Sequence, residues 1–125
     1  MSPDLDADLC LKHPYIFAER QGDITTTAMC QGFQVGDGWH ALLDVLCEEL
    51  QRDTVEKGAP QVVATQVKEK FGRLRFYIKS ASERQRAMID FAEALSPRMC
   101  EECGASCEVD ERRRDCTKTR CPARL

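Results

Sequence analysis

Five of the eight cysteines in this chain fall within residues 99–121, in the stretch MCEECGASCEVDERRRDCTKTRC. Cys100 and Cys103 belong to the motif CEECG, in which two residues separate the thiols and a glycine follows. This spacing is typical of a zinc knuckle, because a tight turn directs both thiolates at one ion and glycine permits the backbone conformation that the turn needs. We therefore expect a structural zinc ion near the end of the chain.

A tetrahedral structural site needs two more ligands from a second loop. Cys116 and Cys121 are the best pair, because they lie far enough along the chain to form the other half of the site, and Cys107 is the reserve. Residues 98–125 contain almost no large apolar side chains and cannot fold by burial. Zinc binding, worth about 10–16 kcal/mol in such sites, would take the place of a core there.

Other uses of these thiols fit the sequence less well. Nothing in the chain indicates the oxidising compartment in which disulfides persist. A thioredoxin-like redox pair follows a strand, whereas CEECG follows a predicted helix. Catalytic zinc needs an open coordination position, which four thiolates do not leave, and the two histidines, His13 and His40, are distant in sequence.

The whole chain has the composition of one domain. It has 125 residues and a formal charge of -3, which gives no overall attraction to nucleic acid or to an anionic membrane. The first residues, MSPDLDADLC, lack the basic start and apolar run of a secretory signal, and no stretch is apolar for long enough to span a membrane. We expect a cytoplasmic protein, in which the thiols stay reduced.

The sequence predicts an α+β fold, with residues 37–97 as a helix, a β-hairpin and a second helix. In GDGWHALLDVLCEELQ the apolar residues recur at steps of three and four, and Asp37 is placed to cap the first turn. The side chains of this apolar face are Trp39, Leu42, Leu43, Leu46, Cys47 and Leu50.

The hairpin is predicted over residues 62–79, where apolar and polar residues alternate around a turn at Gly72. One face of its first strand is expected to carry Val63, Thr65, Val67, Glu69 and Phe71. SERQ, residues 82–85, has the spacing of a capping box and opens a helix that Pro97 stops. The apolar face of that helix is expected to carry Ala87, Met88, Phe91, Ala92 and Leu95.

The two ends of the chain complete the predicted organisation. Residues 1–36 have no sustained period, apart from a short helix over residues 4–12, and we expect an irregular segment that lies over the rest of the fold. Residues 98–125 are expected to form a zinc-ribbon-like module. We expect all three parts to belong to a single domain.

No catalytic motif stands out. Gln66 and Lys68 faintly resemble the acid-x-lysine strand of restriction-like nucleases, but a preceding strand supplies no acidic partner. The chain has no nucleophile elbow and no phosphate-binding glycine loop. We expect a binding protein and not an enzyme.

Two basic stretches are candidate binding surfaces. The hairpin carries Lys68, Lys70, Arg73 and Arg75, with Tyr77 as a possible stacking group, and the tail carries Arg112, Arg113 and Arg114. Phosphate binding is one interpretation. The other is a solvated sheet face and a tail whose own acidic residues nearly balance its charge.

Four motifs in a fixed order, GDGW, QVKEKFG, LRFY and CEECG, give the chain a resemblance to small uncharacterised proteins of tailed phages and prophages, over residues 30–104. Those relatives look like zinc-ribbon proteins whose second ligand pair is commonly a cysteine and a histidine. Cys121 matches that cysteine, but Arg124 stands where the histidine is expected, which makes Cys116 the substitute ligand. The resemblance implies a phage origin and supplies no activity.

Two functions follow as hypotheses. The first is a non-enzymatic phage accessory protein of the bacterial host cytoplasm that binds a host protein complex, such as a defence system of the CRISPR type. The second is a zinc-ribbon protein that binds nucleic acid through the basic hairpin or tail. The sequence does not distinguish Cys107 from Cys116 as fourth ligand, and Cys10 and Cys30 have no interpretable spacing.

Overall fold

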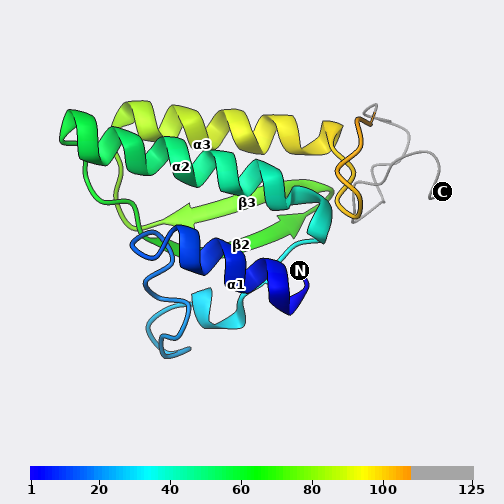
Figure 1. Ribbon diagram of the computed structural model, residues 1–125, viewed down its shortest axis with the longest axis horizontal. Coiled ribbons are helices and arrows are strands. Elements are labelled where there is room, and N and C mark those ends of the chain that lie inside the picture. The colour runs from blue at the N-terminus through cyan, green and yellow to red at the C-terminus, as the bar shows by residue number, and fades with distance from the viewer. Residues whose placement is uncertain (108–125) are drawn as a thin grey trace.

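The computed structural model describes residues 1–107 and has the predicted α+β architecture (Figure 1). The predicted zinc ligands Cys116 and Cys121 and the predicted binding residues Arg112–Arg114 lie outside the described residues. The elements follow in the order α1 (Pro3–Lys12), η1 (Met29–Gln31), β1 (Phe33–Gln34), η2 (Asp37–Trp39), α2 (His40–Lys57), β2 (Ala64–Lys70), β3 (Arg73–Ile78), α3 (Glu83–Leu95) and η3 (Ser96–Arg98).

The sheet has three strands in the order β1-β2-β3. β2 and β3 form the predicted antiparallel hairpin, with Val67 opposite Phe76, and β1 runs parallel to β2, with Phe33 beside Val67. The hairpin turn consists of Phe71 and Gly72, which both have positive φ angles, 54° and 80°. Two positive φ angles in a two-residue loop are the requirement of a type I′ turn.

This geometry corrects the predicted face of the first strand. Phe71 lies in the turn and is 73% exposed, so it does not continue the face that contains Val67. The register also shifts between Ala64 and Gln66, so that Ala64 and Val67, three residues apart, are both fully buried. A bulge of this kind adds one residue and breaks the simple alternation that the sequence pattern assumes.

Helices α1, α2 and α3 cover one face of the sheet, with α2 between the other two (Figure 1). The predicted apolar face of α2 is confirmed, since each of its six residues is buried in the main core: Trp39, Leu42, Leu43, Leu46, Cys47 and Leu50. The prediction that Asp37 caps α2 is wrong. Its carboxylate accepts the N–H of Ser2 at 2.7 Å and does not cap α2. Asp37 begins the 3₁₀ turn ahead of that helix.

Helix α3 begins with the predicted capping box of Ser82 and Gln85. Its buried residues are Gln85, Ile89 and Ala92, whereas Phe91 is 71% exposed. The apolar face that the sequence predicts for α3 is therefore rotated partly towards solvent. Gln85 explains the rotation, because its buried amide donates to the carbonyl oxygens of Leu50 and Pro60 at 3.2 Å, which fixes the polar start of α3 against the end of α2.

The free edge of β3 is closed by α3. The N–H of Phe76 donates to Glu93 Oε2 at 2.9 Å, and the N–H of Leu74 donates to Ser96 Oγ at 2.9 Å. Both are main-chain groups that would otherwise be open to a further strand. The end of α3 is thereby fixed beside the hairpin.

The N-terminal segment is more structured than predicted. The short helix is confirmed as α1, and the same segment supplies β1 and six side chains of the main core: Leu9, Ile16, Phe17, Met29, Phe33 and Val35. Within residues 1–107, no helix is both long enough and apolar enough to cross a membrane.

Candidate metal centre and binding surfaces

The CEECG motif forms a tight turn that follows η3. The N–H of Gly104 donates to the carbonyl of Cys100 at 2.8 Å, and the N–H of Cys100 donates to the carbonyl of Ala105 at 2.7 Å. Gly104 has a φ of 79°, a conformation that favours glycine. The N–H of Cys107 closes the loop on the carbonyl of Arg98 at 2.7 Å. We call residues 98–107 the knuckle.

The knuckle docks against the GDGW motif, more than 60 residues earlier in the chain. The N–H of Gly38 donates to the carbonyl of Glu101 at 2.7 Å, and the N–H of Gly36 donates to its carboxylate at 3.0 Å. The indole Nε1 of Trp39 donates to the carbonyl of Met99 at 2.9 Å. Three successive bonds thus join the start of α2 to the cysteine turn.

Two glycines make this approach possible. A Cβ on Gly38 would lie 2.1 Å from the carbonyl oxygen of Cys100, and one on Gly36 would lie 2.2 Å from that of Glu101. Neither distance is compatible with a side chain, and both neighbours are main-chain atoms that cannot rotate away. The glycines of GDGW therefore allow the close approach of the cysteine turn.

The three described cysteines of the knuckle differ in burial. Cys100 and Cys107 are buried and pack together in a small cluster apart from the main core, whereas Cys103 is exposed. Cys100 and Cys103, two of the expected zinc ligands, thus both lie on the turn, one of them buried and the other exposed. Within residues 1–107, no three metal-ligating side chains are grouped as a complete site.

The basic residues of the hairpin gather on the face of the sheet opposite the helices. Lys68 lies directly opposite Arg75, and Lys70 lies opposite Arg73. Like charges in opposed positions destabilise a sheet, by up to about 0.8 kcal/mol for charges roughly 5 Å apart in water. Arg75 is partly compensated by Glu93, with 3.7 Å between Nη1 and Oε1. Tyr77 is 44% exposed, opposite Gln66 on the same face.

A second surface, which the sequence reasoning missed, is an apolar groove on the outer side of the helix layer. It has a volume of about 490 Å³, and α2 and α3 line it with Leu42, Val45, Leu46, Met88, Phe91 and Leu95. Val45 is 57% exposed and Phe91 is 71% exposed. The sequence shows Val45 and Phe91 as apolar residues of their helices, but their exposure depends on how the two helices pack together.

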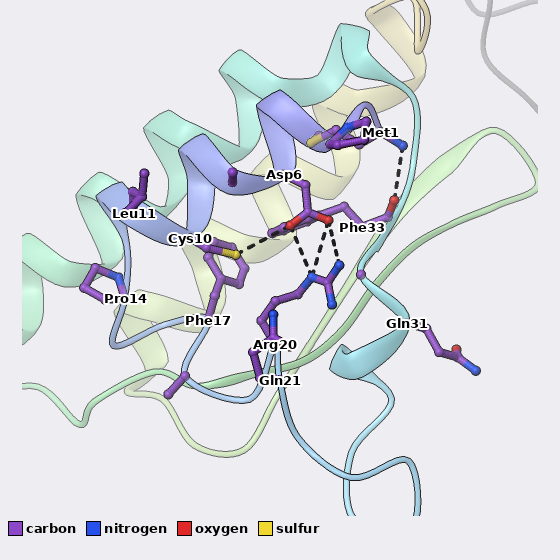
Figure 2. A pocket seen from close by; sticks show the side chains of 14 residues that line it. Met1, Asp6, Cys10, Leu11, Pro14, Phe17, Arg20, Gln21, Gln31 and Phe33 are labelled. Atoms are coloured by element: carbon purple, nitrogen blue, oxygen red, sulfur yellow. Dashed lines mark hydrogen bonds and ion pairs between the residues drawn. The ribbon is translucent and has the colours of Figure 1, made fainter.

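A third hollow, of about 850 Å³, lies beside α1 (Figure 2). In it the guanidinium of Arg20 donates to both carboxylate oxygens of Asp6, at 3.1–3.3 Å, and the Cys10 thiol contacts the same carboxylate at 3.7 Å. Burial raises the pKa of Cys10 to about 11. The thiol is therefore protonated at neutral pH and is a poor nucleophile.

Both histidines join α1 to α2. His13 Nε2 lies 2.7 Å from Asp44 Oδ1, and His40 Nε2 lies 2.8 Å from Asp8 Oδ2, while Lys12 contacts both carboxylates. The hydrogen bond with His40 lowers the pKa of Asp8, and the hydrogen bond with His13 lowers that of Asp44. Each histidine thus has a structural partner, as a boundary residue between two helices.

Comparison of the chain with protein-family models, with curated proteins and with solved structures finds no match.

Proposed function

We propose that this protein is a non-enzymatic binding protein that recognises a partner protein through the groove between α2 and α3. The observation that carries the proposal is the exposure of Val45 and Phe91 on either side of this groove. Exposed apolar grooves of this kind mark protein interaction sites more often than solvated surface. The occupant that fits a channel between two adjacent antiparallel helices is an amphipathic helix of the partner.

Charge and chain length support this choice of occupant. Glu49 and Arg84 give the groove a rim with charges of opposite sign, and each also forms an ion pair within α2 or with it, to Arg52 and to Asp53. A partner helix with acidic and basic flanks would meet a charge of opposite sign on either side. The chain's own residues 108–125 are poor candidates, because only Val109 and Leu125 among them have large aliphatic side chains. The groove therefore requires apolar residues from another molecule.

The resemblance to phage proteins supports a host protein complex as the partner. We propose that the protein blocks or redirects that complex, in a counter-defence role of the anti-CRISPR type. The bacterial host cytoplasm is the corresponding location.

We also propose that one structural zinc ion is held by Cys100, Cys103, Cys116 and Cys121, with Cys107 as the reserve ligand. The closed main-chain turn around Cys100 and Cys103 supports a preformed half-site. Zinc would hold the end of the chain against GDGW and would not take part in a reaction.

Affinity capture with groove variants tests the proposed function. Val45→Glu/Phe91→Glu introduces two charges into the groove, while Leu11→Glu/Val55→Glu makes matched changes at positions that are 82% and 74% exposed elsewhere. We expect wild-type and control chains to recover the same stoichiometric host protein, and the purified pair to bind about 30-fold or more weakly when the groove is charged.

The proposal fails if the purified partner binds the groove variant as tightly as the wild type. It also fails if light scattering shows that the groove joins two copies of this chain, as a dimer that the groove variant alone dissociates.

A further inference from the structure

The basic face of the hairpin is on the opposite side of the sheet from the α2–α3 groove, because α1, α2 and α3 of the described residues 1–107 all lie on one face of the sheet. Val67, Leu74 and Phe76 point into the core, so the residues that alternate with them face outwards. A ligand on this face would not compete with a partner in the groove.

Four cations occupy a small area on this face. Lys68 and Arg75 are cross-strand partners, and Lys70 and Arg73 are the next pair along the ladder. Residues two apart on a strand are about 7 Å apart, and opposed residues about 5 Å apart. A chain with a formal charge of -3 thus concentrates four positive charges within one or two side-chain lengths.

Little acidic charge reaches this cluster. Glu93 contacts Arg75 from the edge of the sheet, and the carboxylate of Glu69, between the two lysines in sequence, accepts the N–H of Gly72 at 2.9 Å. Lys68 and Lys70 form no ion pair with an acidic residue of the part of the chain described here. The face is complementary to a polyanion.

Aromatic and amide groups flank the cations. Phe71, 73% exposed, projects from the turn beside Lys70, whose Nζ lies 6.0 Å from the ring centroid. Tyr77 is exposed at the other end of the cluster, next to the Gln66 amide, which donates to Gln34 at 3.3 Å. Exposed aromatic rings beside backbone-binding cations are the combination that binds unpaired bases.

We propose that this sheet face binds single-stranded nucleic acid, with Lys68, Lys70, Arg73 and Arg75 on phosphates and Phe71 and Tyr77 stacking on bases. A single strand fits better than a duplex, because the hairpin is packed against the helix layer and presents a face and not a free ribbon that could enter a major groove. Recognition of this kind depends on charge and stacking and is largely independent of sequence.

Fluorescence anisotropy with 5′-fluorescein-labelled dT12 and U12 tests the proposal over a range of KCl concentrations. Contacts with three or four phosphates predict a slope of log K against log salt of about -2 to -3. Lys68→Gln/Lys70→Gln should weaken binding on the order of 10-fold at low salt and reduce the slope by about 1.4. The substitutions relieve cross-strand repulsion, so the variant should remain folded.

Matched variants distinguish this face from charge elsewhere. Lys57→Gln/Arg86→Gln removes the same charge from exposed positions of α2 and α3, and should leave both affinity and slope near those of the wild type. Phe71→Ala and Tyr77→Ala change no charge, and should weaken binding about 5-fold or more while leaving the slope unchanged.

Several results would overturn the proposal. The first is no binding of either oligonucleotide at 25 mM or so of KCl. The second is tighter binding of a duplex than of the single strand. The third is a loss of affinity in Lys57→Gln/Arg86→Gln as large as that in Lys68→Gln/Lys70→Gln. Loss of binding in Arg112→Gln/Arg113→Gln/Arg114→Gln with none in Lys68→Gln/Lys70→Gln would assign binding to the tail. Val45→Glu/Phe91→Glu should bind the oligonucleotides normally, so this result is separate from the fate of the groove proposal.

Discussion

The helix-covered sheet and the knuckle are held in place by different kinds of interaction. In the first, buried side chains such as Leu43, Trp39 and Phe76 form one continuous apolar core. In the second, residues 98–107 are attached to GDGW through hydrogen bonds that each use at least one main-chain group, and through the close approach of Gly36 and Gly38. The comparison teaches that an apolar core tolerates gradual change, whereas a backbone contact without a side chain tolerates almost none.

Metal removal is the change with the largest expected effect. It should disrupt the knuckle and leave the helix-covered sheet almost unchanged. Zinc sites of this type contribute about 10 kcal/mol or more of binding free energy. Cys103→Ser, or a strong chelator, should remove stoichiometric zinc and expose the knuckle amides of Cys100, Gly104 and Cys107 to hydrogen exchange, while far-UV circular dichroism of the helices changes little. Cys30→Ser is the control, and the expectation is wrong if purified protein holds no zinc.

Gly38→Ala tests the contact between the knuckle and the GDGW motif. A Cβ would lie 2.1 Å from the carbonyl oxygen of Cys100, so the knuckle must separate from α2, and we expect a loss of about 4 kcal/mol or more in the free energy of unfolding. Urea denaturation measures it. Gly58→Ala is the matched control: it introduces a residue at a φ of 68° with no atom within 4 Å of the new Cβ, and should cost about 1–2 kcal/mol. Equal losses would contradict the backbone contact.

Leu43→Ala tests the apolar region in the same assay. The side chain is fully buried in the first turn of α2, and its truncation should cost about 2–5 kcal/mol. Val45→Ala on the same helix, at a position 57% exposed, should cost about 0.5 kcal/mol or less. If zinc content is unchanged in Leu43→Ala, the two regions are energetically separable.

The smallest effect concerns the joint between α1 and α2. The hydrogen bond with His13 lowers the pKa of Asp44, so this carboxylate stabilises the fold above its unfolded pKa of about 3.9 and ceases to do so as the pH falls through its lower folded value. The stability difference between wild type and Asp44→Asn should therefore shrink as the pH is lowered from 5 towards 3 or below. Glu56→Gln, at an exposed position of α2, should show no such change.

The sequence predicted those elements in which the local pattern of apolar and polar residues indicates which side chains are buried. The stripe of α2, the capping box of α3 and the hairpin are local patterns, and each was found where its period indicated. β1 was missed, because two residues are too few to show an alternation. The face of α3 was wrong at Phe91, because a stripe through Gln85 contains a polar residue whose burial depends on carbonyl groups of α2 and of the following loop.

The candidate site was predictable only in part. CEECG was recognisable from its spacing, but its docking on GDGW joins segments more than 60 residues apart and uses glycines, which have no side chain to show a pattern. Strand alternation alone places Lys68 and Arg75 on one face of the hairpin, and the two residues lie opposite each other in the sheet. The α2–α3 groove was missed because it appears only when two helices are packed.

Glu93 and Ser96 have a consequence for how copies of this protein behave when crowded. Both side chains already occupy the outward N–H groups of Phe76 and Leu74. A neighbouring molecule that tried to extend the sheet beyond β3 would first have to displace a carboxylate and a hydroxyl, and then leave them without their donors. Polymerisation of the protein by edge-to-edge pairing at β3 is thus opposed by two of its own polar side chains, one from α3 and one from η3.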